Sequence, residues 1–332
     1  MKACRACWLL VAGIGAAASL AQGIACGQQV PDAAFKVTVD EPAYVDKHPK
    51  VLFDEAHFNV HTSQGTYKAL VDLMTSDGYK VDVNAKPFDA SVLAGYDVLI
   101  TSNARGAALR SEKPAFTDAE CDAVRDWVQA GGALLLVLDH YPTGHAAENL
   151  AKRFEVVLTK GTTSDRASAP PGTGGGGAIA FSRTNKLLGD HAITRGRSEG
   201  ERINQVVTFT GGSLKGPPGS TALLILSDTA IDTMVSDNPT GTPPAAPAAG
   251  PAGGRRRRVS AVADAPQVSA AGKAQGVALK FGKGRVVVLG EASELSAQRA
   301  GPGQRAMGMN YPDCDNRQWA VNILHWLTGL SD

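Results

Sequence analysis

The feature that most constrains the fold is a helix-to-strand unit over residues 117–138. Thr117-Asp-Ala-Glu120 has the pattern of a capping box, in which the Thr and Glu side chains satisfy free backbone N–H groups at a helix start. Gly131-Gly132 ends the predicted helix, and Ala133-Leu-Leu-Leu-Val-Leu138 follows without polar interruption. A strand of this kind is buried on both faces, as the central strand of a parallel sheet is when helices cover both sides. The unit therefore predicts an α/β fold.

The remaining apolar segments extend this pattern along the chain. A first strand is predicted over Lys50–Phe53, and a helix with an apolar face over Tyr67–Met74 follows it. Further strands are predicted over Tyr79–Val83, Tyr96–Thr101, Phe154–Leu158, Val206–Thr210, Ala222–Leu226, Val277–Phe281 and Arg285–Leu289, with helices near His145–Arg153 and Asn316–Leu327. This order predicts an open, doubly wound, mainly parallel sheet of the flavodoxin-like kind, with a C-terminal hairpin and a closing helix.

The first 25 residues have the pattern of an export signal. Lys2 and Arg5 precede the apolar run Trp8–Leu20, which is short for a membrane span and leads into small residues suited to cleavage. Cleavage after Ala21 or after Ala25 fits this pattern. Gly23-Ile-Ala-Cys26 resembles a lipoprotein processing box with Gly in place of the usual bulky aliphatic residue, so lipidation of Cys26 stays open. We expect an exported protein, periplasmic or extracellular, that reaches a membrane only through such a lipid.

The rest of the chain is predicted to be one domain with interruptions. Residues 26–49 contain prolines and scattered charges and are expected to form a tether before an α/β domain over 50–329. Within that domain, a flexible Gly/Pro loop is predicted at 160–178 and a disordered Pro/Ala/Gly/Arg insertion at 237–276. The chain has 33 Lys+Arg against 32 Asp+Glu, so its overall charge gives no attraction for nucleic acid.

Two cysteines remain once the leader is set aside, Cys121 and Cys314. An oxidising compartment allows them to form a disulfide, and their spacing does not decide between that bond and two free thiols.

Polar side chains follow several of the predicted strands. The carboxyl ends of parallel strands meet at one edge, where open α/β sheets usually hold ligands. His and carboxylate groups at such an edge can bind a divalent metal that activates water for hydrolysis, although the spacing here matches no established metal motif. The candidate catalytic residues are His57, His140, Asp139 and Glu291, the candidate ligand-binding residues are Asp54, Glu55, His61, Asn103, His145 and Ser293, and the candidate metal ligands are His57, His140, Asp54 and Asp139.

Each of these residues also has a structural interpretation. Carboxylates near a helix start often cap it or pair with a nearby cation, and a loop histidine is often only hydrogen-bonded. On this interpretation Asp54 and Glu55 cap the first helix or pair with Arg105, His57 is a hydrogen-bonded loop residue, His61 is solvated, Asp139 and His140 fix a turn, and Glu291 accepts from backbone N–H groups with Ser293 as a cap.

Several motifs, in this order, carry a resemblance to a known superfamily. They are Phe53-Asp-Glu-Ala-His57, Gly95-Tyr-Asp-Val-Leu-Ile100, Val128-Gln-Ala-Gly-Gly-Ala-Leu-Leu135, His191-Ala-Ile-Thr194, Gly284-Arg-Val-Val-Val-Leu-Gly-Glu291 and Asn322-Ile-Leu-His-Trp-Leu327. The chain resembles the class I glutamine amidotransferase-like superfamily, and more narrowly the exported bacterial domains of unknown function similar to those of gliding-motility and ABC-transport auxiliary proteins.

The resemblance breaks at the position of the nucleophile. Enzymes of this superfamily carry a Cys at the sharp turn after a central strand, and here that turn reads Leu138-Asp-His-Tyr141. A nucleophile must lie beside a base and face an oxyanion hole, so glutaminase activity is not expected. Two hypotheses remain: a non-catalytic module that binds an unknown cell-envelope ligand or protein, and a hydrolase, with or without a divalent metal, at the sheet edge.

Overall fold

The computed structural model describes residues 29–106, 113–173, 177–235 and 265–332. The predicted export signal, Cys26 and most of the predicted insertion lie outside these residues. Within them, no helix is both long and apolar enough to cross a membrane.

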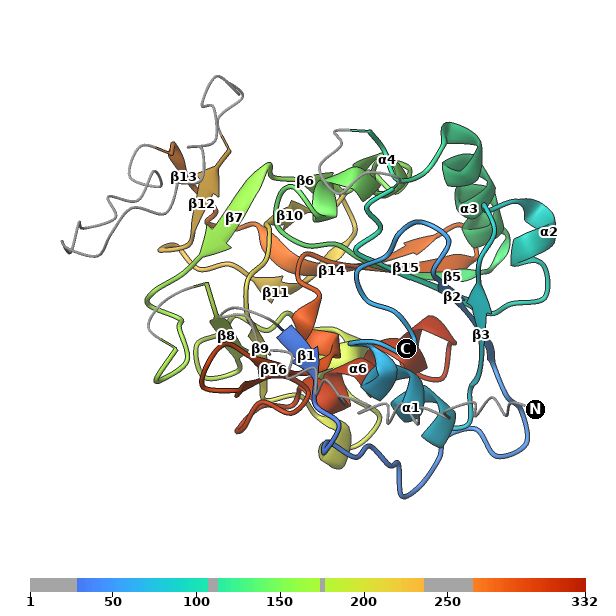
Figure 1. Cartoon of the computed structure of the whole chain (residues 1–332), viewed down its shortest axis with the longest axis horizontal. Coiled ribbons are helices and arrows are strands. Elements are labelled where there is room, and N and C mark those ends of the chain that lie inside the picture. The colour runs from blue at the N-terminus through green and yellow to red at the C-terminus, as the bar shows by residue number, and fades with distance from the viewer. Residues whose placement is uncertain (1–28, 107–112, 174–176, 236–264) are drawn as a thin grey trace, which may run out of the picture.

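A mixed sheet forms the centre of the molecule (Figure 1). Its first five strands are parallel, and the remaining strands join antiparallel to their neighbours. The order is β3 (Lys80–Asn84), β2 (Lys50–Asp54), β4 (Val98–Ser102), β5 (Ala133–Val137), β15 (Gly284–Leu289), β14 (Ala274–Phe281), β10 (Leu214–Lys215) and β6 (Val157–Leu158), and β11 (Thr221–Ile225) also pairs with β14. The prediction of an α/β fold with a largely parallel sheet is confirmed.

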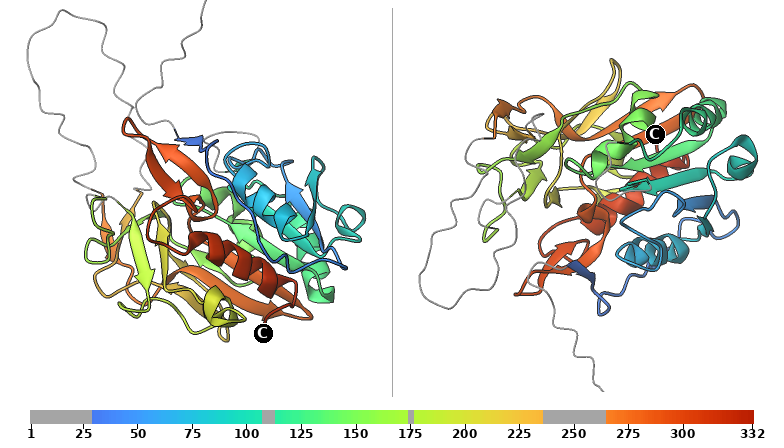
Figure 2. Two further views of the ribbon diagram at one scale, coloured as in Figure 1. Left: turned by 90° about the horizontal axis from the view of Figure 1, so that it is seen from below. Right: turned by 45° about the horizontal axis from the view of Figure 1, so that its top comes forward.

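Helices cover both faces of this sheet because alternate residues of each strand point to opposite sides. In β5, Leu135 and Val137 join one core cluster, while Leu134 and Leu136 join the other. The first cluster packs under α1 (Lys68–Ser76) and α6 (Asn316–Leu327), and the second under α2 (Ala90–Leu93), α3 (Asp118–Ala130) and α4 (Glu148–Lys152) (Figures 1 and 2).

The local signals of the helix-to-strand unit are reproduced in the structure. Thr117 and Glu120 form the capping box at the start of α3. Gly131 ends the helix with a φ of 129°, a backbone conformation that favours glycine. The short helical pieces elsewhere are η1 (Gly144–Ala147), α5 (Ala192–Arg195), η2 (Glu199–Glu201) and η3 (Ser293–Leu295).

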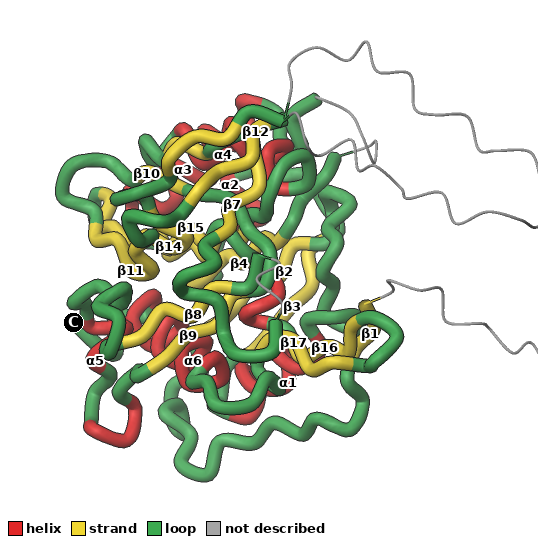
Figure 3. The backbone as a smooth tube through the Cα atoms, turned by 90° about the vertical axis from the view of Figure 1, so that its left-hand side faces the viewer, coloured by secondary structure: helices red, strands yellow, loops and turns green. Residues whose placement is uncertain are grey.

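Three small sheets gather at one side of the molecule, which faces the viewer in Figure 3. Their bounds are β7 (Gly161–Ser164), β12 (Ile231–Met234) and β13 (Gln267–Ser269) in one, β8 (Ile179–Ser182) and β9 (Gln205–Thr208) in another, and β1 (Gln29–Pro31), β16 (Ala297–Ala300) and β17 (Arg305–Gly308) in the third.

The flexible loop predicted at 160–178 is wrong over its first part. Strand β7 pairs with β12, and the buried Thr163 hydroxyl donates to Asp232 at 2.6 Å. Asp165 is also buried and accepts hydrogen bonds from Ser227 and Thr229. Buried hydroxyl–carboxylate pairs order a segment whose composition resembles a loop.

The insertion predicted at 237–276 is too long at its C-terminal end. Residues 267–269 form β13, and β14 begins at Ala274, where Ala274 and Gln275 are buried. Pairing with β12 and β15 gives this polar segment backbone partners that its composition does not reveal.

The predicted tether is wrong for residues 29–49, which pack on the domain. Strand β1 pairs antiparallel with β16, and the partly buried Phe35, Val37 and Val39 pack against the core. The backbone N–H of Val39 donates to Ser76 at 2.7 Å, and that of Ala43 donates to Asp77 at 2.8 Å. The alternation of apolar and polar residues gives this segment one face that can dock.

This packing predicts that the N-terminal segment contributes to stability. A protein that starts at Lys50 should unfold with a free energy lower by at least about 3 kcal/mol than one that starts at Gln29, because several apolar side chains lose their burial. Urea denaturation of both proteins measures the difference. Equal midpoints and slopes would show that residues 29–49 are a tether after all.

Candidate functional site

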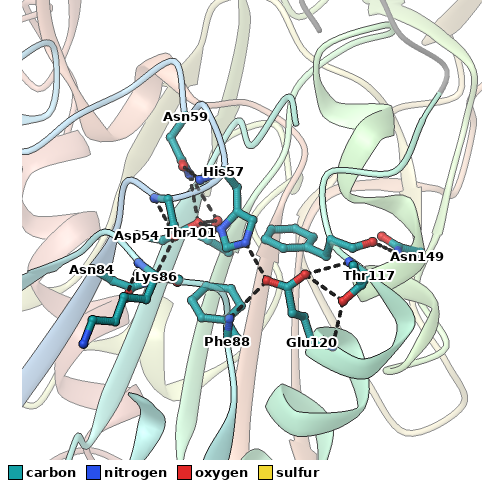
Figure 4. A network of polar contacts seen from close by, with 12 residues as sticks. Asp54, His57, Asn59, Asn84, Lys86, Phe88, Thr101, Thr117, Glu120 and Asn149 are labelled. Atoms are coloured by element: carbon teal, nitrogen blue, oxygen red, sulfur yellow. Dashed lines mark hydrogen bonds and ion pairs between the residues drawn. The ribbon is translucent and has the colours of Figure 1, made fainter. Parts of the chain in front are cut away.

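The chain's own loop occupies the place where an open α/β sheet usually binds ligand. The order of the parallel strands reverses between β2 and β4, and ligands bind in the crevice that such a reversal opens at the carboxyl ends. The Asn59 amide donates to Asp54 at 3.2 Å, to the Thr101 hydroxyl at 3.3 Å and to the Ser102 carbonyl at 3.1 Å. The loop after β2 is therefore bonded across the crevice (Figure 4).

His57 lies between two carboxylates in this loop (Figure 4). Its Nδ1 is 2.9 Å from each oxygen of Asp54, and its Nε2 is 2.9 Å from Oε1 of Glu120. The ring packs between Phe88 and Phe116, whose centroids are 4.7 and 4.6 Å away. His57 is 6% exposed and Asp54 is fully buried. The geometry fits an imidazolium that donates from both nitrogens.

Electrostatics support the charged form of His57. Burial lowers the pKa of the ring, but the hydrogen bonds and charges of Asp54 and Glu120 outweigh it, so the pKa is raised above 6.5. Burial raises the pKa of Glu120, but the backbone N–H of Thr117, His57 and the other donors outweigh it, so this pKa is lowered. With both nitrogens engaged, His57 has no lone pair to accept a proton or bind a metal.

The sequence gives no signal for the contact between His57 and Glu120. Glu120 is predictable only as the third residue of the capping box, where its Oε2 accepts from the N–H and hydroxyl of Thr117, both at 2.8 Å. Its other oxygen accepts from the backbone N–H of Phe88 at 3.1 Å and faces His57. The two residues are 63 positions apart, so only the packed fold brings them together.

Asp139, Asn103 and His140 form a second group at the ends of β4 and β5. Asp139 accepts from the Asn103 amide at 2.9 Å and from the backbone N–H of His140 at 2.7 Å. The His140 ring is partly exposed, with Nδ1 2.8 Å from the Tyr141 carbonyl and Nε2 3.7 Å from Asp139. Burial raises the pKa of Asp139, against the lowering effect of His140 and Asn103. The structural interpretation of this pair, a fixed turn, agrees with these contacts.

Glu291 and Glu294 form a third group after β15. Glu291 accepts from the backbone N–H groups of Ser293 and Glu294, each at 2.8 Å, as its structural interpretation expects. Burial and the charge of Asp139 raise the pKa of Glu291 to about 8. Burial and Glu291 raise the pKa of Glu294 well above its usual range. The repulsion between Asp139 and Glu291 links the second group to the third.

The remaining candidate residues have local partners. Glu55 accepts from the backbone N–H of Ser63 at 2.6 Å. His61 is 4% exposed and stacks on Tyr67, so the expectation of a solvated ring is wrong. Burial lowers the pKa of His61 to about 4, which keeps the stacked ring neutral. His145, in η1, has its Nε2 2.9 Å from the carboxylate of Glu148 at the start of α4.

The proposed metal ligands do not form a metal site. Asp54 with His57 and Asp139 with His140 lie in different groups, and both ring nitrogens of His57 face carboxylates. Across the described ranges, no three His, Cys, Asp or Glu side chains are placed to hold one metal ion. The geometry of these residues gives no support to a metal-dependent reaction at the edge.

The two cysteines of the domain are both free thiols. Cys121 is buried on α3, and burial raises its pKa to about 12. Burial also raises the pKa of Cys314 to about 11, and its Sγ donates to the Tyr311 carbonyl at 3.3 Å.

No protein-family model matches this chain, and no curated protein matches it. Solved structures do match. The mmIFT52 N-terminal domain has a TM-score of 0.55 and 14% sequence identity, over 84% of this chain and 97% of that chain. At this identity the likeness shows a shared fold alone.

Two further solved structures are more distant. A protein from Bacteroides uniformis ATCC 8492 described as ThuA-like has 14% identity and a TM-score of 0.42, over 86% of this chain and 94% of its own. A protein from Thermoplasma acidophilum described as part of a GMP synthase has 11% identity and a TM-score of 0.41, over 84% and 94%. Scores of this size add nothing to the fold that the sheet order defines.

The His57 network predicts a large loss of stability when its cation is removed. His57→Gln should lower the free energy of unfolding by about 3–5 kcal/mol at pH 7, because it leaves two buried carboxylates without a shared positive charge. His48→Gln is the matched control, since His48 is exposed and has one contact, to the Gly78 carbonyl. Equal losses in the two variants, measured by urea denaturation, would contradict the buried imidazolium.

The raised pKa values also predict how stability changes with pH. The stabilisation from His57 is complete below pH 6.5 and is lost as the pH rises through its higher folded-state pKa. Folded Glu291 keeps its proton up to a pKa of about 8, whereas the unfolded side chain releases it near 4.5, so stability again falls as the pH rises between these values.

We therefore expect the free energy of unfolding to decrease from about pH 7 to about pH 8, above the range in which the lowered pKa of His61 acts in the opposite direction. Glu291→Gln should flatten this profile, and Glu155→Gln, at an exposed position, should leave it unchanged. Denaturation curves at several pH values provide the measurement. A wild-type profile that rises over this range would show that the buried groups are ionised differently.

Proposed function

We propose that this chain is an exported domain of amidotransferase-like fold that lacks the catalytic nucleophile and serves the cell envelope as a ligand-binding or scaffold module. One observation carries the proposal. The histidine at the switch point of the sheet is held between two carboxylates, at 2.9 Å on both sides, and has no free nitrogen. A general base needs such a lone pair within reach of its substrate.

The position of the thiols supports the absence of a nucleophile. A catalytic Cys works as a thiolate beside a base, at a partly exposed site. Asp139 and His140 stand at the turn after β5, while Cys121 and Cys314 lie on or before helices, with pKa values raised by burial to about 12 and about 11. Thiols with such pKa values are almost entirely protonated near pH 7.

Export and the kind of partner rest on the sequence. The charged start, short apolar run and small residues of the first 25 positions support secretion, and lipidation at Cys26 supplies a means of attachment. The nearly balanced charge supports a cell-envelope ligand or protein as the partner in preference to nucleic acid.

Hydrolysis is the second candidate function, and one observation favours it. Glu291, with a pKa of about 8, is coupled by charge to Asp139, whose neighbour His140 is partly exposed. A carboxyl group that keeps its proton near neutral pH has the property of a general acid. This hypothesis places the reaction at His140, Asp139 and Glu291 and leaves His57 with a structural role.

Activity and thiol reactivity test the two functions on the purified processed protein. We expect no turnover of glutamine or of nitrophenyl esters, phosphates and glycosides beyond that of a Cys121→Ser/Cys314→Ser variant. Iodoacetamide at pH 7.5 should label both cysteines at least about tenfold more slowly than free cysteine, since the thiolate fraction falls tenfold for each unit of pKa.

Two results would contradict the proposal. Turnover that disappears in His140→Ala but persists in His48→Gln would establish the hydrolase, and a cysteine labelled faster than free cysteine would reveal a nucleophile.

The intact mass of the protein purified from the producing cells tests export, because a chain that still starts at Met1 would show that the leader is not removed.

A further inference from the structure

A large cavity lies beside the β16–β17 hairpin, and its lining includes none of the polar groups described above. The hairpin is labelled in Figure 3. Its volume is about 990 Å³, at the upper end of the range for sites that bind small molecules. No residue of the His57 network lines it. Its walls are residues 171–173, Ala178, Phe209, Thr210 and the hairpin with the turn that follows, at 299–303, 305–307 and 310–312.

One cation of the cavity is uncompensated. The guanidinium of Arg299 is paired, with its Nε 2.8 Å from Asp32. Arg305 is exposed and makes no side-chain hydrogen bond or ion pair with any residue that the structure describes. A guanidinium offers a planar pair of donors that matches a carboxylate.

The two threonines and the asparagine in the walls already use their donors internally. The Thr173 hydroxyl donates to the Pro170 carbonyl at 2.7 Å, and the Thr210 hydroxyl donates to the Phe209 carbonyl at 2.6 Å. The Asn310 amide donates to Asp32 at 2.8 Å and to the Gln298 carbonyl at 3.0 Å. A saccharide, whose many hydroxyl groups each need a partner, would leave several of them unsatisfied here.

The remaining wall is apolar. Phe209 and Tyr311 meet edge to face with centroids 5.3 Å apart, and Met307 lies in the same wall. The Tyr311 hydroxyl makes no hydrogen bond to the described residues and can donate to the same ligand that Arg305 binds. One cationic side chain, Arg305, beside aromatic and thioether groups suits an amphipathic molecule that carries an anionic group.

From these contacts we infer that the cavity binds a small carboxylate with an aromatic or aliphatic body, its carboxylate on Arg305 and its body against Phe209, Tyr311 and Met307. The inference rests on the proposed ligand-binding function and gives that function a site and a ligand class. It also assigns the site to residues of the hairpin and its neighbours in place of the polar groups that were candidates from the sequence.

Calorimetric titration with 4-phenylbutyrate and the uncharged 4-phenylbutanol tests this inference on the processed protein. We expect saturable binding of the carboxylate and weaker binding of the alcohol. Arg305→Gln should weaken the carboxylate at least about fivefold, the upper range for an exposed ion pair, and leave the alcohol unchanged. Arg195→Gln is the matched control, because Arg195 is also exposed and does not line the cavity.

A second variant tests the apolar wall. Ala306→Trp places a large side chain in the lining and should weaken both probes. The inference is overturned if the wild type shows no saturable binding, if both probes bind equally, or if Arg305→Gln binds the carboxylate as tightly as Arg195→Gln does. Failure of the proposed non-catalytic function would be seen separately, by chromatography of the probe recovered after titration. A chemically converted probe would show that the protein is an enzyme, whether or not Arg305 contributes to binding.

Discussion

The buried charge of His57 is the interaction on which the polar edge depends. Taking an imidazolium out of water is unfavourable, and two carboxylates at 2.9 Å outweigh that cost only while their remaining oxygens are also hydrogen-bonded. Asp54 accepts from Thr101 and Asn59, and Glu120 accepts from Thr117 and Phe88. The network thus joins the end of β2, the end of β4, the segment before α2 and the start of α3, of which β2 and β4 also pair through their backbones.

The usual ligand-binding place of the parallel sheet is filled by the chain's own loop, so we assign ligand recognition to another part of the molecule. Where strand order reverses, an open sheet leaves room for a ligand, and here Asn59 and His57 bond across that room. The cavity with an uncompensated cation is instead lined by residues 171–173, by Ala178 and by the β16–β17 hairpin, which lie outside the parallel core. Stability and binding are therefore assigned to different parts of the chain. A substitution in the His57 network is expected to change the free energy of unfolding, and one in the cavity is expected to change ligand affinity.

Sequence patterns predict the parallel core well because its signals are local. The capping box at Thr117, the glycine at 131 and the apolar run from Ala133 each determine their own neighbourhood. The bonds of Glu291 to its own loop follow its structural interpretation, because its partners are near in sequence. The contact of His57 with Glu120, which belongs to another element, was not predictable. Apart from β9, which the prediction at Val206–Thr210 matches, the strands of the small sheets were missed. Strands of three or four residues, such as β1 and β13, are stabilised by distant partners and carry no periodic signal.

The pairing of β1 with β16 also determines how the protein would face a surface. Strand β1 begins at Gln29, three residues after Cys26, and a fully extended chain spans only about 3.5 Å per residue. The distance between a lipid-bearing Cys26 and the start of β1 would thus be at most about 10 Å, which is too short for the domain to tumble freely. The side of the molecule that carries β1 and β16 would lie closest to the bilayer, so attachment would also orient the protein.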